Sequence, residues 1–167
     1  NGALIFNKNS NFIINGVTGT GNLSATATSG FIRLGGNITQ NGSVTLTSSN
    51  SAFAQNGIRQ SAATTITASS INITGGFASA DNDSGYVLTL NTSAANGNIY
   101  LDVYNGASGQ TWGGLSSLVA NAGTGNVTIA GSQAGSAGAW TGSLTGALNI
   151  SSNFSPGRAL GETFFLL

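Results

Sequence analysis

The chain has no cysteine or histidine, one proline, and only four basic and four acidic residues among 167. The lack of cysteine excludes disulfides and thiolate nucleophiles, and the lack of histidine excludes the usual zinc sites. The formal net charge is zero, so there is no electrostatic footprint for nucleic acid or anionic membranes. No apolar run approaches the roughly 18 residues of a transmembrane helix. We therefore expect no cofactor, no metal and no nucleic-acid partner.

Residues typical of strands and turns dominate what is present. The chain has 26 glycines, and its apolar residues, 40% of the total, occur singly between Thr, Ser and Asn. Low charge and low proline argue against disorder. No segment shows the 3.6-residue period of a helix, and Gly or Asn interrupts every run. The sequence predicts an all-β chain, with residues 1–167 forming a single segment.

Three six-residue phrases repeat at intervals of 21 and 20 residues. They are LSATAT (23–28), VTLTSS (44–49) and TTITAS (64–69). Their alternation has the period of two that a strand requires. Aligned, they put Ala25, Leu46 and Ile66 in one inward column. The expected outward columns are Ser24, Thr45 and Thr65, and Thr26, Thr47 and Thr67.

A second apolar series accompanies the first at a similar interval and predicts a second strand in each coil. It pairs Ile38 with Ile58, and aligns Phe31, Phe53 and Ile73. The predicted core rungs are therefore Ala25, Leu46, Ile66, Ile38, Ile58, Phe53 and Ile73.

A repeat of this length cannot bury its apolar side alone, but stacked copies can. Each strand would pair in parallel with the strand above, about 4.8 Å away, and inward residues would form ladders. A β-sandwich or propeller would not keep equivalent positions in columns. We expect a parallel β-helix (β-solenoid) with about 20 residues per coil, roughly eight coils and about 40 Å of stack. Neither end carries a polar cap, so we expect a piece of a longer protein.

The pattern loosens in the middle of the chain. Residues 86–90 and 99–103 read as strands on two sides of one enlarged coil, followed by a projecting loop, Tyr104 to Gly114. Large aromatic residues cluster here, and specific recognition commonly uses such residues on loops. We predict a partner-binding patch of Tyr100, Asp102, Tyr104 and Trp112. In the alternative interpretation, these rings cover a loop or a widened core.

The phrases GSVTLTSS (42–49), AATTITASSINITGG (62–76) and GNVTIAGS (125–132) resemble the haemagglutinin repeats of large exoproteins. Gram-negative bacteria export these proteins by two-partner secretion, and filamentous haemagglutinin-like adhesins and contact-dependent inhibition proteins belong to the group. The resemblance implies a right-handed parallel β-helix, passage through an outer-membrane transporter, and a secreted or cell-surface location. No Asn-Pro-Asn secretion motif is present, and the family supplies no catalytic residues.

The sequence thus favours a structural or adhesive segment without catalytic activity that contacts a cell-surface receptor or glycan. Three other functions stay open. Flat threonine ladders could bind ice, and uncapped ends could join copies into a fibre. A carbohydrate-cleaving enzyme would need a carboxylate pair, for which Asp81, Asp83 and Asp102 lie about one coil apart. The sequence DNDSG (81–85) is equally typical of an Asx turn.

Overall fold

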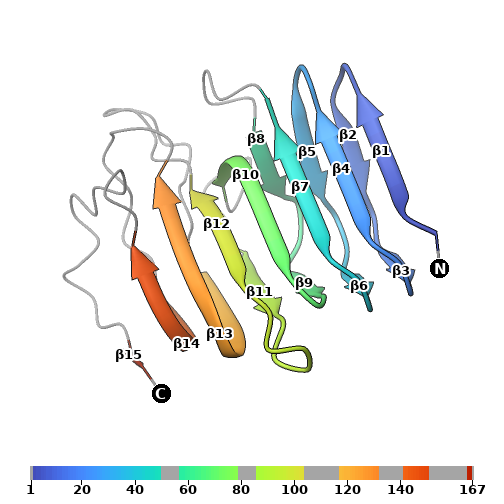
Figure 1. Ribbon diagram of the computed structural model, residues 1–167. Helices are drawn as coiled ribbons and strands as arrows, with labels where there is room; N and C mark the ends of the chain where they lie inside the picture. The colour runs from blue at the N-terminus through green and yellow to red at the C-terminus, as the bar shows by residue number, and fades with distance from the viewer. Residues whose placement is uncertain are drawn as a thin grey trace, which may run out of the picture.

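The computed structural model describes residues 2–49, 57–78, 86–103, 117–131, 141–150 and 165–166. These residues form fifteen strands in one strongly curled sheet, and every recorded strand pair is parallel (Figure 1). Strands β1 and β15 lie at opposite ends of the stack. Among the residues described, no helix is long and apolar enough to span a membrane.

The strands fall into three stacks, which we call faces A, B and C. Face A stacks β1 (Leu4–Lys8), β4 (Leu23–Ala27), β7 (Val44–Ser48), the first half of β10 (Ile71–Ala78), β12 (Ile99–Val103), and the second halves of β13 (Ser117–Gly131) and β14 (Thr141–Ile150). Face B stacks β2 (Phe12–Ile14), β5 (Phe31–Leu34), β8 (Gly57–Gln60) and the end of β10. Face C stacks β3 (Val17–Gly19), β6 (Ile38–Gln40), β9 (Thr64–Thr67), β11 (Val87–Asn91), the first halves of β13 and β14, and β15 (Phe165–Leu166). The chain is therefore a parallel β-solenoid.

Strand alternation builds the core, because every second side chain points into the coil. Strands β4 and β7 alternate strictly between buried and half-buried residues. The predicted rungs Ala25, Leu46, Ile66, Ile38, Ile58 and Ile73 are all completely buried. Phe53 lies outside the described residues. The inward positions thus match the sequence pattern, and the apolar ladders hold the stack together.

The register that we expected between these rungs is wrong. Ala25 does pair with Leu46, but the next rung on Leu46 is Ile73, and Ile66 belongs to face C, between Ile38 and Leu90. The second series also splits. Ile58 lies on face B between Ile32 and Phe77, and Phe31 pairs with Gly57.

The error arose because coil length is not constant. Successive register positions on face A are 19, 21, 27, 28, 28 and 21 residues apart, through Leu4, Leu23, Val44, Ile71, Ile99, Val127 and Leu148. The connection from β7 to β8 is residues 49–56, whereas residues 28–30 connect β4 to β5. Since β7 on face A and β9 on face C share the same Thr-x-Thr alternation, a strand of face C resembles one of face A at the wrong offset.

Asparagine side chains at several corners of the described chain tie one coil to the next. The Oδ1 atom accepts a hydrogen bond from a backbone N–H one coil later in five cases, at 2.9–3.0 Å. The pairs are Asn11 with Phe31, Asn22 with Ser43, Asn37 with Thr65, Asn96 with Thr124, and Asn98 with Asn126. Gly42 lies directly against the Asn22 amide and the Gly21 carbonyl, where a Cβ atom has no room. This packing explains much of the Asn and Gly content.

Candidate functional site

Two of the four residues predicted to bind a partner lie in the described part of the chain. Tyr100 and Asp102 are both on β12, two residues apart, so both point outward from face A. Both are half-buried. Tyr104 and Trp112 lie outside the described residues, so the structure brings together only the first two members of the patch.

Asp102 has a structural partner that the sequence did not reveal. Its Oδ2 atom accepts hydrogen bonds from the backbone N–H groups of Gly75 (3.0 Å) and Gly76 (3.1 Å). Both glycines have positive φ angles, 98° and 82°, which L side chains rarely adopt. They lie where β10 changes register between Ile73 and Phe77 and passes from face A to face B. The carboxylate therefore holds this corner with charge-assisted hydrogen bonds.

Tyr100 stands between two polar side chains in its column. Asn72 is its register neighbour on β10, and Thr128 is its neighbour on β13. Burial raises the pKa of the Tyr100 phenol above its ordinary value near 10, and the negative charge of Asp102 raises it further. An aromatic ring flanked by an amide and a hydroxyl can stack on a sugar ring and hydrogen-bond its hydroxyls.

This environment predicts that Tyr100 ionises at a higher pH than an unperturbed phenol. Because the folded pKa is raised, the unfolded chain loses this proton first as the pH increases. The stabilising contribution is present below about pH 10 and is lost above it. Ultraviolet titration should show a phenol that ionises above the ordinary range, and this component should be absent in Tyr100→Phe. The urea-unfolded protein is the control, in which all three should titrate together near 10. If Tyr100→Phe loses absorbance change near pH 10 rather than at higher pH, this environment is contradicted.

The threonine columns lie on two different faces, whereas the sequence predicted them on one. Thr26, Thr47 and Thr74 share one outward column of face A, and the Thr74 hydroxyl donates to the Thr47 hydroxyl at 3.1 Å. The predicted continuation through Thr65 and Thr67 is wrong, because both lie on face C. There the register aligns Thr18, Thr39 and Thr67, while Thr65 pairs with Thr89.

A cationic cluster on face B was missed in the sequence, where the arginines looked scattered. Arg33 and Arg59 are direct register neighbours on β5 and β8. Both guanidinium groups lie over the Phe31 ring, 5.1 and 5.3 Å from its centroid. Arg59 is only 7% exposed. The sequence feature that could have predicted this pairing is the Ile-Arg dipeptide, which occurs in FIRL (31–34) and again 26 residues later in GIRQ (57–60).

The acidic residues of the enzyme hypothesis are not brought together among the described residues. Asp81 and Asp83 lie outside them, and the register neighbour of Asp102 on β13 is Ala130. Within the described ranges, no group of three or more His, Cys, Asp or Glu residues is placed to hold a metal ion.

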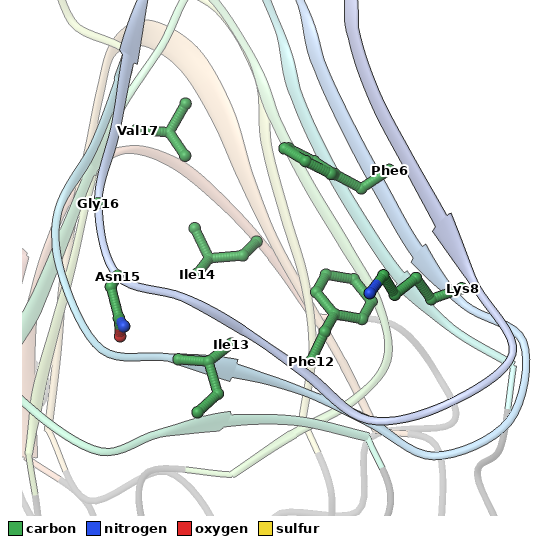
Figure 2. Close-up of a pocket in the computed structure, with 8 residues that line it drawn as sticks. All are labelled: Phe6, Lys8, Phe12, Ile13, Ile14, Asn15, Gly16 and Val17. Carbon is green, nitrogen blue, oxygen red and sulfur yellow. The ribbon is translucent and has the colours of Figure 1, made fainter.

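A hollow of about 310 Å³ lies in the first coil of the described chain (Figure 2).

Comparison with known proteins gives no assignment for these surfaces. No protein-family model, no curated protein and no solved structure matches this chain.

Proposed function

We propose that this chain is a structural and adhesive segment of a secreted or surface-displayed bacterial exoprotein, with its outer surface contacting cells or glycans. The observation that carries the proposal is Tyr100, a half-buried aromatic residue on the outside of a solenoid face, in line with Asn72 and Thr128. The strand pairing places the backbone of these three residues side by side before any ligand arrives. A rigid site loses little conformational entropy on binding.

The residues around Tyr100 suit a carbohydrate better than a charged ligand. Asn72 and Thr128 flank Tyr100 in its own column, and Asp102 lies two residues further along β12, so amide, hydroxyl and carboxylate groups occur near the ring. Asp102 is bonded to Gly75 and Gly76, which holds its carboxylate still beside the phenol. Hydroxyl-rich sugars bind through such planar arrays of polar groups around an aromatic ring.

The experiment compares Tyr100→Ala with Thr45→Ala, a control in the same outward column two coils away. Glycan-array and cell-adhesion assays should show affinity falling about tenfold or more in Tyr100→Ala, since truncating an aromatic anchor typically costs over 1 kcal/mol. Thr45→Ala should bind normally. The double variant Tyr104→Ala, Trp112→Ala should abolish adhesion while its circular-dichroism spectrum and Tm persist.

Two results would contradict the adhesive proposal. The first is equal binding by wild type, Tyr100→Ala and the double variant, which would show that these aromatic residues do not bind the ligand. Turnover of a polysaccharide that disappears in Asp83→Asn or Asp102→Asn would assign an enzyme instead.

Ice binding is the second candidate, and the Thr26, Thr47 and Thr74 column favours it. The column spans three coils. A thermal-hysteresis assay on the purified chain separates this function from glycan adhesion, because ice binding needs no ligand other than ice.

A further inference from the structure

The outward side of face A carries one charged side chain among its described residues, and that side chain is close to Tyr100. Tyr100 and Asp102 point to the same side of β12, two residues and about 6.6 Å apart along the strand. β12 itself lies between β10 and β13 in the stack (Figure 1). The other charged residues of the described chain are placed differently, with Lys8 at an inward position of β1 and Arg33 and Arg59 on face B. The described outward surface of face A is therefore negative at Asp102 alone.

The Asp102 carboxylate is held in a fixed position. Its Oδ2 atom accepts hydrogen bonds from the backbone N–H groups of Gly75 at 3.0 Å and Gly76 at 3.1 Å, on the neighbouring strand β10. Charge-assisted hydrogen bonds of this kind are stronger than neutral ones, so the side chain cannot rotate away from a ligand without losing them. The negative charge is thus a permanent feature of the surface next to the Tyr100 ring.

The charge of Asp102 acts at the Tyr100 phenol. Burial is the main cause of the raised pKa of this phenol, and the negative charge of Asp102 raises the pKa further. An electrostatic field that disfavours the phenolate also disfavours any other anion placed on the ring. Both side chains are half-buried, and water screens charges less at such positions than on an open surface.

The other polar neighbours of Tyr100 do not discriminate between donors and acceptors. Asn72 is exposed and Thr128 is half-buried, and they flank the ring in its own column. An amide has both donor and acceptor groups, and a hydroxyl can take either role. A carboxylate only accepts, so a ligand group that faces Asp102 has to be a donor, such as a hydroxyl or an amine. Asp102 is therefore the selective member of this group.

We infer that Asp102 determines which class of glycan binds at Tyr100, accepting uncharged, hydroxyl-rich glycans and rejecting acidic ones. The inference rests on the proposed function. A neutral sugar stacked on the Tyr100 ring and extending along β12 donates a hydroxyl hydrogen bond to the Asp102 carboxylate. A sugar with a carboxylate or sulfate at the same place brings a second anion against one that cannot move. Juxtaposed like charges are a common means of excluding a wrong partner from a binding site.

The first experiment uses a glycan array with matched pairs, namely N-acetyllactosamine with and without terminal sialic acid, and with and without sulfate. The wild-type chain should bind the neutral member of each pair at least about tenfold more tightly. Asp102→Asn removes the charge and keeps an oxygen that can accept from Gly75 and Gly76. This variant should retain the wild-type Tm and bind the neutral and acidic members about equally.

Two further charge variants test the sign and the place of the effect. Asn72→Asp adds a second carboxylate in register with Tyr100 and should strengthen the rejection of acidic glycans. Asn121→Asp is the matched control, because it adds the same charge on face C, where Asn121 is in register with Asn91. Its Oδ1 atom accepts from the Gly123 N–H at 3.0 Å, and aspartate keeps this oxygen. The control should show the wild-type ratio of neutral to acidic binding.

Salt dependence tests the inference on the wild-type chain, whether or not Asp102→Asn folds. The Debye length falls from about 10 Å at 0.1 M salt to about 3 Å at 1 M. If the Asp102 charge causes the discrimination, the difference in affinity between neutral and acidic glycans should shrink over this range. Binding of the neutral glycans should change little, because it involves no ligand charge. Steric exclusion of the larger acidic glycans would not depend on salt.

The possible failures are distinguishable. If the wild-type chain binds the acidic member of each pair as tightly as the neutral one, the role of Asp102 is refuted while glycan adhesion at Tyr100 stands. Discrimination that persists unchanged at 1 M salt and in Asp102→Asn would be steric, and it also refutes this role. If the wild-type chain binds no neutral glycan on the array and Tyr100→Ala behaves identically, the proposed function fails and the inference fails with it.

Discussion

Leu46→Asp is expected to unfold the stack, with a loss of more than about 4 kcal/mol in the free energy of unfolding. Leu46 is fully buried between Ala25 and Ile73, so the carboxylate would be surrounded by the apolar ladder of face A. The coils on both sides lose their contact with this rung at once, because each coil packs only on its neighbours. Loss of the β-sheet circular-dichroism signal and of a cooperative urea transition would measure the effect.

Thr45→Asp is the matched control for this prediction. The new charge is the same and the position is adjacent, but Thr45 points outward between Ser24 and Asn72 and is half-buried. The change should cost less than about 1 kcal/mol, as expected for a surface substitution. Equal destabilisation by the two variants would mean that the inward and outward assignment of β7 is incorrect.

A disulfide between positions 47 and 74 is expected to stabilise the solenoid by about 3 kcal/mol. The Thr47 and Thr74 hydroxyls are 3.1 Å apart, and neighbouring strands lie about 4.8 Å apart, within the range that a disulfide spans. The bond would close a loop of 27 residues and restrict the unfolded chain. In Thr47→Cys, Thr74→Cys, oxidation should raise the Tm by roughly 6–12 °C relative to the reduced protein.

The comparison variant Thr47→Cys, Thr67→Cys tests the register that the sequence suggested. The repeated phrases place Thr47 directly beneath Thr67, but Thr67 lies on face C beside Thr39. No disulfide should form, and oxidant should leave the Tm unchanged. A disulfide at 47–67 with none at 47–74 would restore the register of the phrases and refute the observed one.

The kind of fold was predictable because local chemistry decides it. Alternation of small polar and apolar residues requires strands, as in Leu23–Ala27 and Val44–Ser48, and their 21-residue spacing is the true register. The burial of Leu46 and Ile66 followed from the same alternation, since the period of two fixes which side of a strand faces inward. The phrases VTLTSS (44–49) and TTITAS (64–69) are nearly identical although they lie on different faces. Their similarity cannot show which face each belongs to, so the predicted register between them was wrong.

The candidate site was predictable only in part. The outward position of Tyr100 and Asp102 on β12 follows from their spacing in an apolar-alternating strand. The bonds of Asp102 to Gly75 and Gly76 join residues 27 and 26 positions apart, and no local pattern marks them. The Arg33–Arg59 pair had a signal in the repeated Ile-Arg dipeptide, but its 26-residue offset differs from the 20 of the preceding coil on the same face.

The sequence by itself determined that this chain forms parallel coils with an aliphatic interior and a hydroxyl- and amide-rich exterior. It did so through period-two alternation, Asn and Gly corners, and the near absence of charge. Only the tertiary structure decided which strands are neighbours, and therefore which threonines share a column and what holds Asp102. The physical reason is that pairing between coils depends on the length of each corner, which varies from coil to coil, whereas alternation depends only on the next residue along the strand.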